Sequence, residues 1–210
     1  VPSFWKGTTL VTNGLMLAEE DYEVFAPASM IYYPNVTDWA PVSAEILNEG
    51  TVRDIKMQEK IYRNVREIYT EKDYQQLVVI SRPSADSCLR IIDGENPLYS
   101  ARDSSRIMEI GAYSKLDQIQ TIPEEPSVYP FFLADELDHD WCYYYEKMEL
   151  ALQMDDAEAA AELADEAAAM NFKAKDNLEL IPVIEAYAET GRSDDALETA
   201  RKLLRDSYTA

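Results

Sequence analysis

The stretch that decides the fold is "VIEAYAETGRSDDALETARKLL", residues 183–204. A small residue beside an aromatic one, Ala186-Tyr187, is followed by Gly191 and then by a second apolar pattern. The members of that second pattern are Ala196, Leu197, Leu203 and Leu204. Glycine readily adopts the left-handed conformation that ends a helix. The stretch therefore predicts two antiparallel helices joined by a short turn.

A second, weaker copy of this pattern lies upstream in residues 143–170. There Asp155 occupies the position of Gly191 and Ala160 that of Ala196, and each pair is 36 residues apart. Two such hairpins resemble tetratricopeptide repeats, whose period is about 34 residues. The resemblance implies a region of about four helices, with small residues where the helices pack closely.

The character of the sequence changes near residue 125. Upstream, apolar runs rich in β-branched residues at 8–12, 76–81 and 88–93 predict buried strands, and the last two form a strand pair. Helical patterns lie between and after these strands. Residues 1–122 are therefore predicted to form a small domain of the α/β (or α+β) class.

Four segments of this domain show helical patterns. A helix in residues 19–34 is expected to be interrupted at Pro27, and a short helix is expected to start after Pro41. Residues 51–69 place apolar side chains near a helical period, although the end of this segment also fits a strand. Residues 104–119 predict the last helix of the domain.

A proline-rich and acidic segment, residues 123–139, is predicted to link the two parts of the chain. Proline cannot continue a helix or a central strand, so this segment marks a boundary. The tetratricopeptide-like helical region then covers residues 140–210. Because roughly three or more repeats are needed to bury a continuous core, we expect this region to pack on the first domain.

Composition restricts the classes of partner. The 210 residues include 40 Asp and Glu against 19 Lys and Arg, which gives a net charge of -21. Such a chain repels phosphate backbones and anionic membrane surfaces, so no nucleic acid partner is expected. No run approaches the ~18 consecutive apolar residues that a membrane-spanning helix requires. We therefore expect no direct insertion of this segment in a membrane.

The segment 133–153 is the strongest candidate for chemistry, because the chain's single histidine, His139, lies there among acidic residues. Asp135, Asp138, His139 and Asp140 would suit a metal ion as ligands, but their spacing fits no known metal-binding loop. In the alternative interpretation, an aspartate caps a helix that begins near Trp141. Five residues at helical spacing would then face the core, and we favour this interpretation. These residues are Trp141, Tyr144, Tyr145, Met148 and Leu152.

Other motifs give no prediction of catalysis. Neither a serine-nucleophile motif nor a glycine-rich phosphate loop occurs, so no catalytic residue, metal or cofactor is expected. Cys88 and Cys142 lack the paired spacing of a zinc or redox motif, which leaves two buried thiols or one disulfide. Asn35 begins an Asn-Val-Thr triplet that fits a glycosylation sequon. Aromatic side chains also stack on sugars. The candidate ligand-binding residues are Asp138, His139, Trp141 and Tyr144.

Four strings resemble a known family when they are taken in order and followed by the degenerate repeat. They are "TTLVTN" (8–13), "APASMIYYP" (26–34), "SCLRIIDGENP" (87–97) and "HDWCYYYEKMELALQ" (139–153). The chain resembles the C-terminal soluble portion of large polytopic membrane proteins of bacteria. Some of those proteins are similar to integral-membrane glycosyltransferases of the oligosaccharyltransferase-like class.

The resemblance implies that membrane spans lie upstream of Val1 and that this portion faces the extracytoplasmic side. That setting permits a disulfide between Cys88 and Cys142. The implied function is a non-catalytic interaction or assembly module, whose partner is a protein or the membrane part of the same polypeptide. Two alternatives stay open. One is a glycan-handling enzyme or accessory domain of a membrane glycosyltransferase, and the other is a cytoplasmic helical-repeat adaptor, which free thiols would favour.

Overall fold

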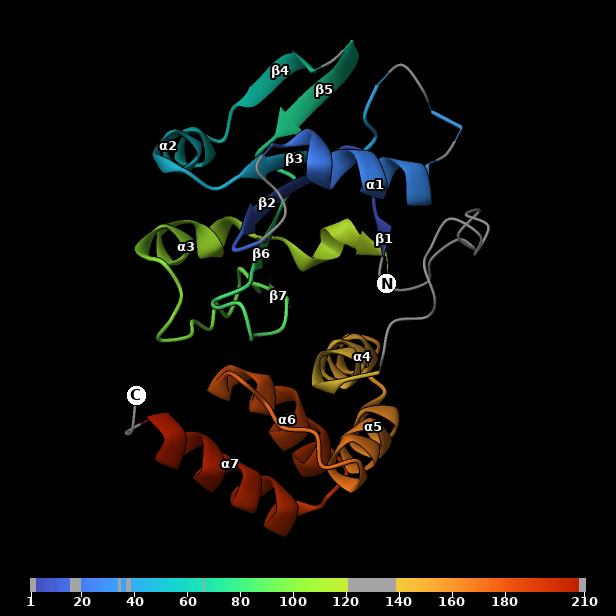
Figure 1. The fold of residues 1–210 in the computed structure, drawn as a ribbon, viewed down its shortest axis with the longest axis vertical. Helices are drawn as coiled ribbons and strands as arrows, with labels where there is room; N and C mark the ends of the chain where they lie inside the picture. The colour runs from blue at the N-terminus through green and yellow to red at the C-terminus, as the bar shows by residue number, and fades with distance from the viewer. Residues whose placement is uncertain are drawn as a thin grey trace. The chain divides into compact units, whose positions relative to one another are not determined.

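The computed structural model describes residues 3–15, 20–33, 35–36, 39–65, 67–120 and 139–207. It has mixed α/β content and divides into two compact units (Figure 1). The α/β unit comprises Val1–Ala85 and Arg90–Glu136, and the helical unit comprises Asp86–Leu89 and Leu137–Ala210. The predicted fold class, a small α/β domain followed by about four helices, is confirmed. The expected linker 123–139 lies, except for His139, outside the described residues.

The α/β unit is built on a four-stranded sheet in the order β3-β2-β6-β7. Strand β2 (Thr9–Asn13) lies in the interior and is parallel to both β3 (Ser43–Ile46) and β6 (Leu77–Ser81). Strand β7 (Arg90–Ile91) is antiparallel to β6 at the edge. Four of the five residues of β2 and of β6 are buried, as expected for parallel strands that are covered on both faces.

Helices cover both faces of this sheet (Figure 1). Leu10 of β2 packs on the face that also buries Phe25, whereas the next residue, Val11, packs on the opposite face with Ile55 and Ile107. Successive side chains of a strand point to opposite faces, so each face needs its own layer. The helices are α1 (Tyr22–Tyr32), which carries Phe25, and α2 (Glu49–Met57) and α3 (Ser105–Ile110), which carry the two isoleucines.

Three local predictions in this unit are wrong. The segment after Pro41, expected to be a helix, forms strand β3, because Val42 and Ala44 alternate into the core beside β2. Helix α1 continues through Pro27, since packing of the helix against the sheet outweighs one lost hydrogen bond. Residues 51–69 are not one helix: α2 ends at Met57, and the remainder forms strands, which was the alternative for its end.

Short elements complete the α/β unit. Strands β4 and β5 form an antiparallel hairpin, and β1 pairs with β8. The bounds are β1 (Ser3–Phe4), β4 (Lys60–Val65), β5 (Ile68–Asp73), η1 (Gly111–Tyr113), η2 (Leu116–Gln118) and β8 (Ile119–Gln120).

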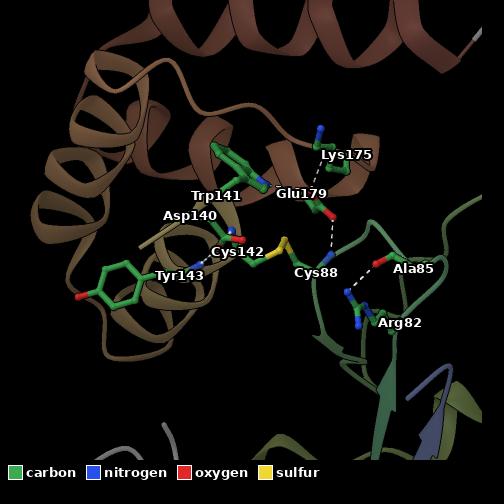
Figure 2. Close-up of a disulfide and its surroundings, with 9 residues drawn as sticks. All are labelled: Arg82, Ala85, Cys88, Asp140, Trp141, Cys142, Tyr143, Lys175 and Glu179. Carbon is green, nitrogen blue, oxygen red and sulfur yellow. Dashed lines mark hydrogen bonds between the residues drawn. A yellow bond between two sulfur atoms is a disulfide. The ribbon is translucent and has the colours of Figure 1, made fainter. Parts of the chain in front are cut away.

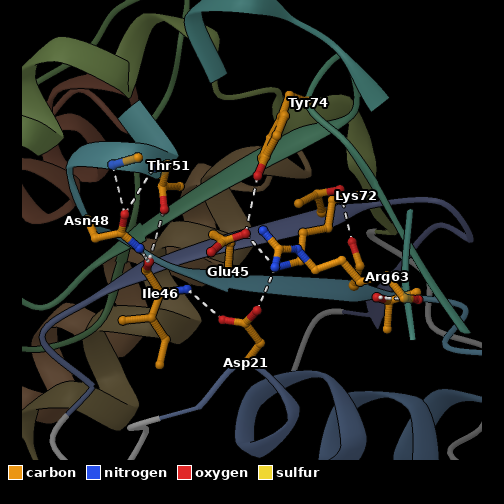
Figure 3. Close-up of polar contacts among 12 residues, drawn as sticks. Asp21, Glu45, Ile46, Asn48, Thr51, Arg63, Lys72 and Tyr74 are labelled. Atoms are coloured by element: carbon orange, nitrogen blue, oxygen red, sulfur yellow. Dashed lines mark hydrogen bonds and ion pairs between the residues drawn. The ribbon is translucent and has the colours of Figure 1, made fainter. Parts of the chain in front are cut away.

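One buried cation, Lys72, connects three elements of this unit. Lys72 of β5 is buried and forms ion pairs with Asp21, just before α1, and with Glu45 of β3 (Figure 3). The hydroxyl of Tyr74 donates to Glu45 Oε2 at 3.2 Å, and burial raises the pKa of Tyr74 well above its usual range. A buried ammonium group needs such partners, because an unpaired charge is costly away from water. We read this cluster as structural.

The helical unit consists of two helical hairpins. Helices α4 (Trp141–Gln153) and α5 (Ala157–Ala169) form the first, and α6 (Ile181–Glu189) and α7 (Ser193–Ser207) form the second. A 3-10 turn, η4 (Asn177–Leu180), precedes α6. The buried face of α5 is made almost wholly of alanine, which lets neighbouring helices approach closely.

The turns of the two hairpins have the same backbone conformation. Asp155 (φ 57°) follows α4 and Gly191 (φ 76°) follows α6, and both are left-handed. In each turn this residue donates its N–H to the carbonyl three residues earlier, and the next N–H donates to the carbonyl five residues earlier. These paired bonds are the Schellman motif. The second hairpin therefore repeats the first at the spacing of 36 residues that the sequence shows.

Replacing Asp155 by glycine is expected to raise the free energy of unfolding by roughly 0.5–1 kcal/mol, because glycine adopts a positive φ without steric cost. Gly191→Ala is the converse test. An added Cβ there would meet no atom within 4 Å, so its expected loss of about 1 kcal/mol reflects backbone conformation alone. Chemical denaturation measures both changes. Effects of the same sign in the two variants would contradict the equivalence of the turns.

Candidate functional site

A disulfide between Cys88 and Cys142 lies at the start of the helical hairpins (Figure 2). The two Cα atoms are 5.2 Å apart, and the cysteines are 54 residues apart in sequence. Of the two arrangements that the sequence leaves open, the structure has the disulfide. Both cysteines belong to the helical unit, because Asp86–Leu89 is part of it. The bond therefore joins α4 to a short segment from much earlier in the chain.

A buried glutamate lies beside the disulfide (Figure 2). The side chain of Glu179 belongs to a fully buried residue and accepts three hydrogen bonds, each of 2.8 Å. The donors are the backbone N–H groups of Cys88 and Lys175 and the indole N–H of Trp141. Three donors compensate a carboxylate for its lost hydration. Glu179 thus connects η4, α4 and the Cys88 segment.

The opening of α4 is a capped helix, as the sequence predicts. The carboxylate of Asp140 accepts from the N–H groups of Cys142 (3.0 Å) and Tyr143 (3.3 Å). The residues expected to face the core are buried, except for Leu152, which packs against the core from its edge. This packing accounts for the aromatic residues of the segment without a catalytic role.

The candidate ligand-binding residues do not share one exposed surface. Trp141 and Tyr144 are 8% and 3% exposed and lie in the core. His139 is exposed and stacks on Tyr143, with ring centroids 3.8 Å apart. Asp138 lies outside the described residues. Within the part of the chain that the structure describes, no three His, Cys, Asp or Glu side chains gather as metal ligands do.

The candidate glycosylation residue, Asn35, is exposed in a turn after α1. Thr37, the third residue of its sequon, lies outside the described residues. The side chain of Asn35 is therefore accessible to solvent, as a modified asparagine must be.

A groove of about 540 Å³ lies between α7 and the other helices of the helical unit. Its buried lining residues include Ala164 of α5 and Val183 and Tyr187 of α6, and its partly buried ones include Phe172 and Leu180. The α7 side of the groove is a stripe of residues spaced three or four apart, so they lie on one helix face. They are Asp195, Glu198, Thr199, Lys202 and Arg205. At the helical rise this stripe is about 15 Å long.

The groove concentrates positive charge in an acidic unit. Residues 137–210 contain 7 Lys and Arg against 18 Asp and Glu. The groove reverses this balance, with four basic side chains against two acidic ones. The basic residues are Lys173, Arg192, Lys202 and Arg205. The lining of the groove therefore carries a net positive charge within a unit whose net charge is negative.

Two of these four cations are already paired. Lys202 pairs with Glu198 at 3.0 Å. Arg192 forms a bidentate pair with Asp165, at 2.6 and 3.0 Å, and its guanidinium group lies 4.1 Å from the ring centroid of Tyr187. Lys173 and Arg205 are exposed, and no ion pair links either to another described residue. These two are the cations available to a ligand.

The Arg192 cluster fixes the α6–α7 turn to α5. Besides Asp165, Arg192 contacts Asp195 at 2.8 Å, and the Tyr187 hydroxyl donates to Asp165 Oδ1 at 2.8 Å. The Arg192 guanidinium holds the pKa of Asp165 below its usual range, and burial raises the pKa of Tyr187 to about 12. At neutral pH Asp165 is therefore ionised and Tyr187 neutral, so this end of the groove is electrostatically satisfied.

The described residues thus define a mixed α/β protein whose helical hairpins carry a basic groove. No protein-family model, curated protein or solved structure matches the chain. Among the helices that the structure describes, none combines the length and apolar character needed to cross a bilayer.

The sequence reasoning missed two parts of the site, Glu179 and the groove. Glu179 follows no periodic pattern, and its three donors come from three separate segments. The groove does leave a signal, because Lys202 and Arg205 continue the helical stripe that begins at Asp195. Nothing in that stripe distinguishes a groove from an ordinary solvated face.

Proposed function

We propose that this chain is a non-catalytic interaction or assembly module whose helical unit holds a segment of a protein partner against α7. The observation that carries the proposal is the groove, with its partly apolar lining and two cations, Lys173 and Arg205, that no ion pair links to another described residue. Protein segments bind in such grooves because apolar contacts supply affinity and charges fix register and specificity. The partner is a separate protein or the membrane part of the same polypeptide.

The proposal also places the module on the extracytoplasmic side of a membrane. Disulfides persist in oxidising compartments and are rare in the cytoplasm, so the Cys88–Cys142 bond supports this location. The resemblance of the string at 139–153 and of the three upstream strings to bacterial polytopic membrane proteins supports it as well. The same bond counts against the cytoplasmic adaptor.

A glycan-handling role receives less support. A sugar site at the start of α4 would need exposed rings, whereas Trp141 and Tyr144 are buried in the core. Of the described rings there, His139 is exposed and Tyr143 is partly exposed. A neutral glycan would also offer no carboxylate to Lys173 and Arg205 of the groove.

Lysine labelling in intact cells tests the proposed function. A membrane-impermeant amine reagent is expected to modify Lys147, an exposed residue of α4 outside the groove, at the same rate in cells and in the purified chain. Lys173 is expected to react about tenfold more slowly in cells, which corresponds to about 90% occupancy of the groove by a partner. Quantitative mass spectrometry of the peptides reads out both sites.

Two results would contradict the proposal separately. If Lys147 reacted only after cell lysis, the extracytoplasmic location would be wrong. If Lys173 reacted equally fast in cells and in the purified chain, the groove would not be the partner's site.

A further inference from the structure

We propose that the groove binds an extended, acidic peptide segment that carries a large apolar side chain. This inference rests on the proposed function and adds the chemistry of the partner. It follows from three properties of the groove: its size, the state of its cations and its partly apolar lining.

The size of the groove favours an extended occupant. The α7 stripe from Asp195 to Arg205 is about 15 Å long, which four or five residues of extended chain would span. Because alternate side chains of an extended segment point to opposite sides, such a segment can contact the α7 stripe and the α6 lining at once.

The state of the cations favours an acidic occupant. Arg192 is held by two aspartates, and an anion could recruit it only by displacing them. Lys173 and Arg205 are exposed and can pair with ligand carboxylates without breaking an ion pair to another described residue. Asp165 and Asp195 lie with Arg192 at one end of the stripe, and Arg205 lies at the other. The two ends of the groove therefore differ in charge, and the Arg205 end is the more positive. Acidic residues are expected at the Arg205 end.

The lining favours an apolar anchor in the same segment. Val183 is almost fully buried beneath the groove, while Phe172 and Leu180 are only partly buried and present surface to it. The ring of Phe172 lies 5.8 Å from that of Tyr144 in the core, which limits its movement. An aromatic or leucine side chain of the ligand would cover this surface and supply the main apolar contact.

The test uses the full oxidised chain and an array of peptides of about eight residues, matched in hydrophobicity and varied in net charge and in one central residue. Binding is expected to rise with the number of Asp and Glu and to need a central Phe or Leu. Fluorescence anisotropy then gives the affinity of the strongest peptide. The double variant Lys173→Glu/Arg205→Glu is expected to bind it about tenfold or more weakly.

Lys6→Glu/Lys147→Glu is the matched control, since both residues are exposed and neither lines this groove. This variant also reverses two positive charges and is expected to alter the affinity less than about twofold. Circular dichroism checks that all variants keep their helices. An unchanged affinity of the double variant would overturn the inference.

Three further outcomes would also overturn it: binding that does not depend on peptide charge, no binding by any acidic peptide, or equally strong competition by an acidic oligosaccharide such as oligogalacturonate. The last would point to an anionic glycan instead. The first two are distinguishable from a failure of the proposed function, because a protein partner of other chemistry would still protect Lys173 in cells, whereas the glycan outcome overturns both.

Discussion

The Glu179→Ala variant is expected to lose about 3–5 kcal/mol of unfolding free energy in the helical unit. The carboxylate accepts hydrogen bonds from two buried N–H groups and from the partly buried N–H of Lys175, and alanine would remove this acceptor from all three. Each unsatisfied buried donor costs about 1–3 kcal/mol, and the release of a buried charge offsets part of the sum. Urea denaturation followed by hydrogen exchange in α4 and α6 measures the effect in this unit.

Two further variants make this test specific. Glu185→Ala removes an exposed carboxylate from α6 and is expected to change stability by less than about 0.5 kcal/mol. Glu179→Gln keeps the shape of the side chain but turns an amide NH2 group toward N–H donors. Its loss of unfolding free energy is therefore expected to lie between those of Glu179→Ala and Glu185→Ala. A Glu179→Ala variant as stable as Glu185→Ala would show that Glu179 does not hold these segments together.

Loss of the disulfide is the second large effect. The bond closes a loop of 54 residues, and loop-closure entropy predicts that the Cys88→Ala/Cys142→Ala variant loses about 4 kcal/mol. Reduction of the native chain should lower its stability by a similar amount, because it opens the same loop. The double variant should not respond to reductant. Thermal or chemical denaturation with and without reductant gives all four values.

One result would contradict this prediction. If the reduced native chain had the same free energy of unfolding as the oxidised chain, the disulfide would contribute nothing to the stability of the helical unit. The Glu179 hydrogen bond and packing in the core would then hold the Cys88 segment without help from the disulfide.

The helical unit could be predicted well from the sequence because its determinants are local. A residue that accepts a left-handed conformation, Gly191 or Asp155, marks each turn, and the spacing of 36 residues shows that the hairpins correspond. The apolar stripe behind Asp140 likewise predicts a capped helix with one face in the core. Apart from the spacing of 36 residues, each of these signals lies within about three or four helical turns.

The wrong predictions concern segments whose conformation depends on residues far away in the sequence. Strand β3 owes its conformation to pairing with β2, more than thirty residues earlier, and its short sequence after Pro41 is equally compatible with a helix. The same holds for the site. Glu179 becomes important only when Cys88, Trp141 and Lys175 come together in the fold. The groove depends on the course of residues 171–177, which no periodicity predicts.

The most direct test of the central claim, that the helical unit is a disulfide-closed module working outside the cytoplasm, is the intact mass of the protein from its native cells. Thiols are blocked with an alkylating reagent at the moment of lysis. We predict no alkylation of Cys88 or Cys142 before reduction and alkylation of both after it. Alkylation of both cysteines without reduction would contradict the claim.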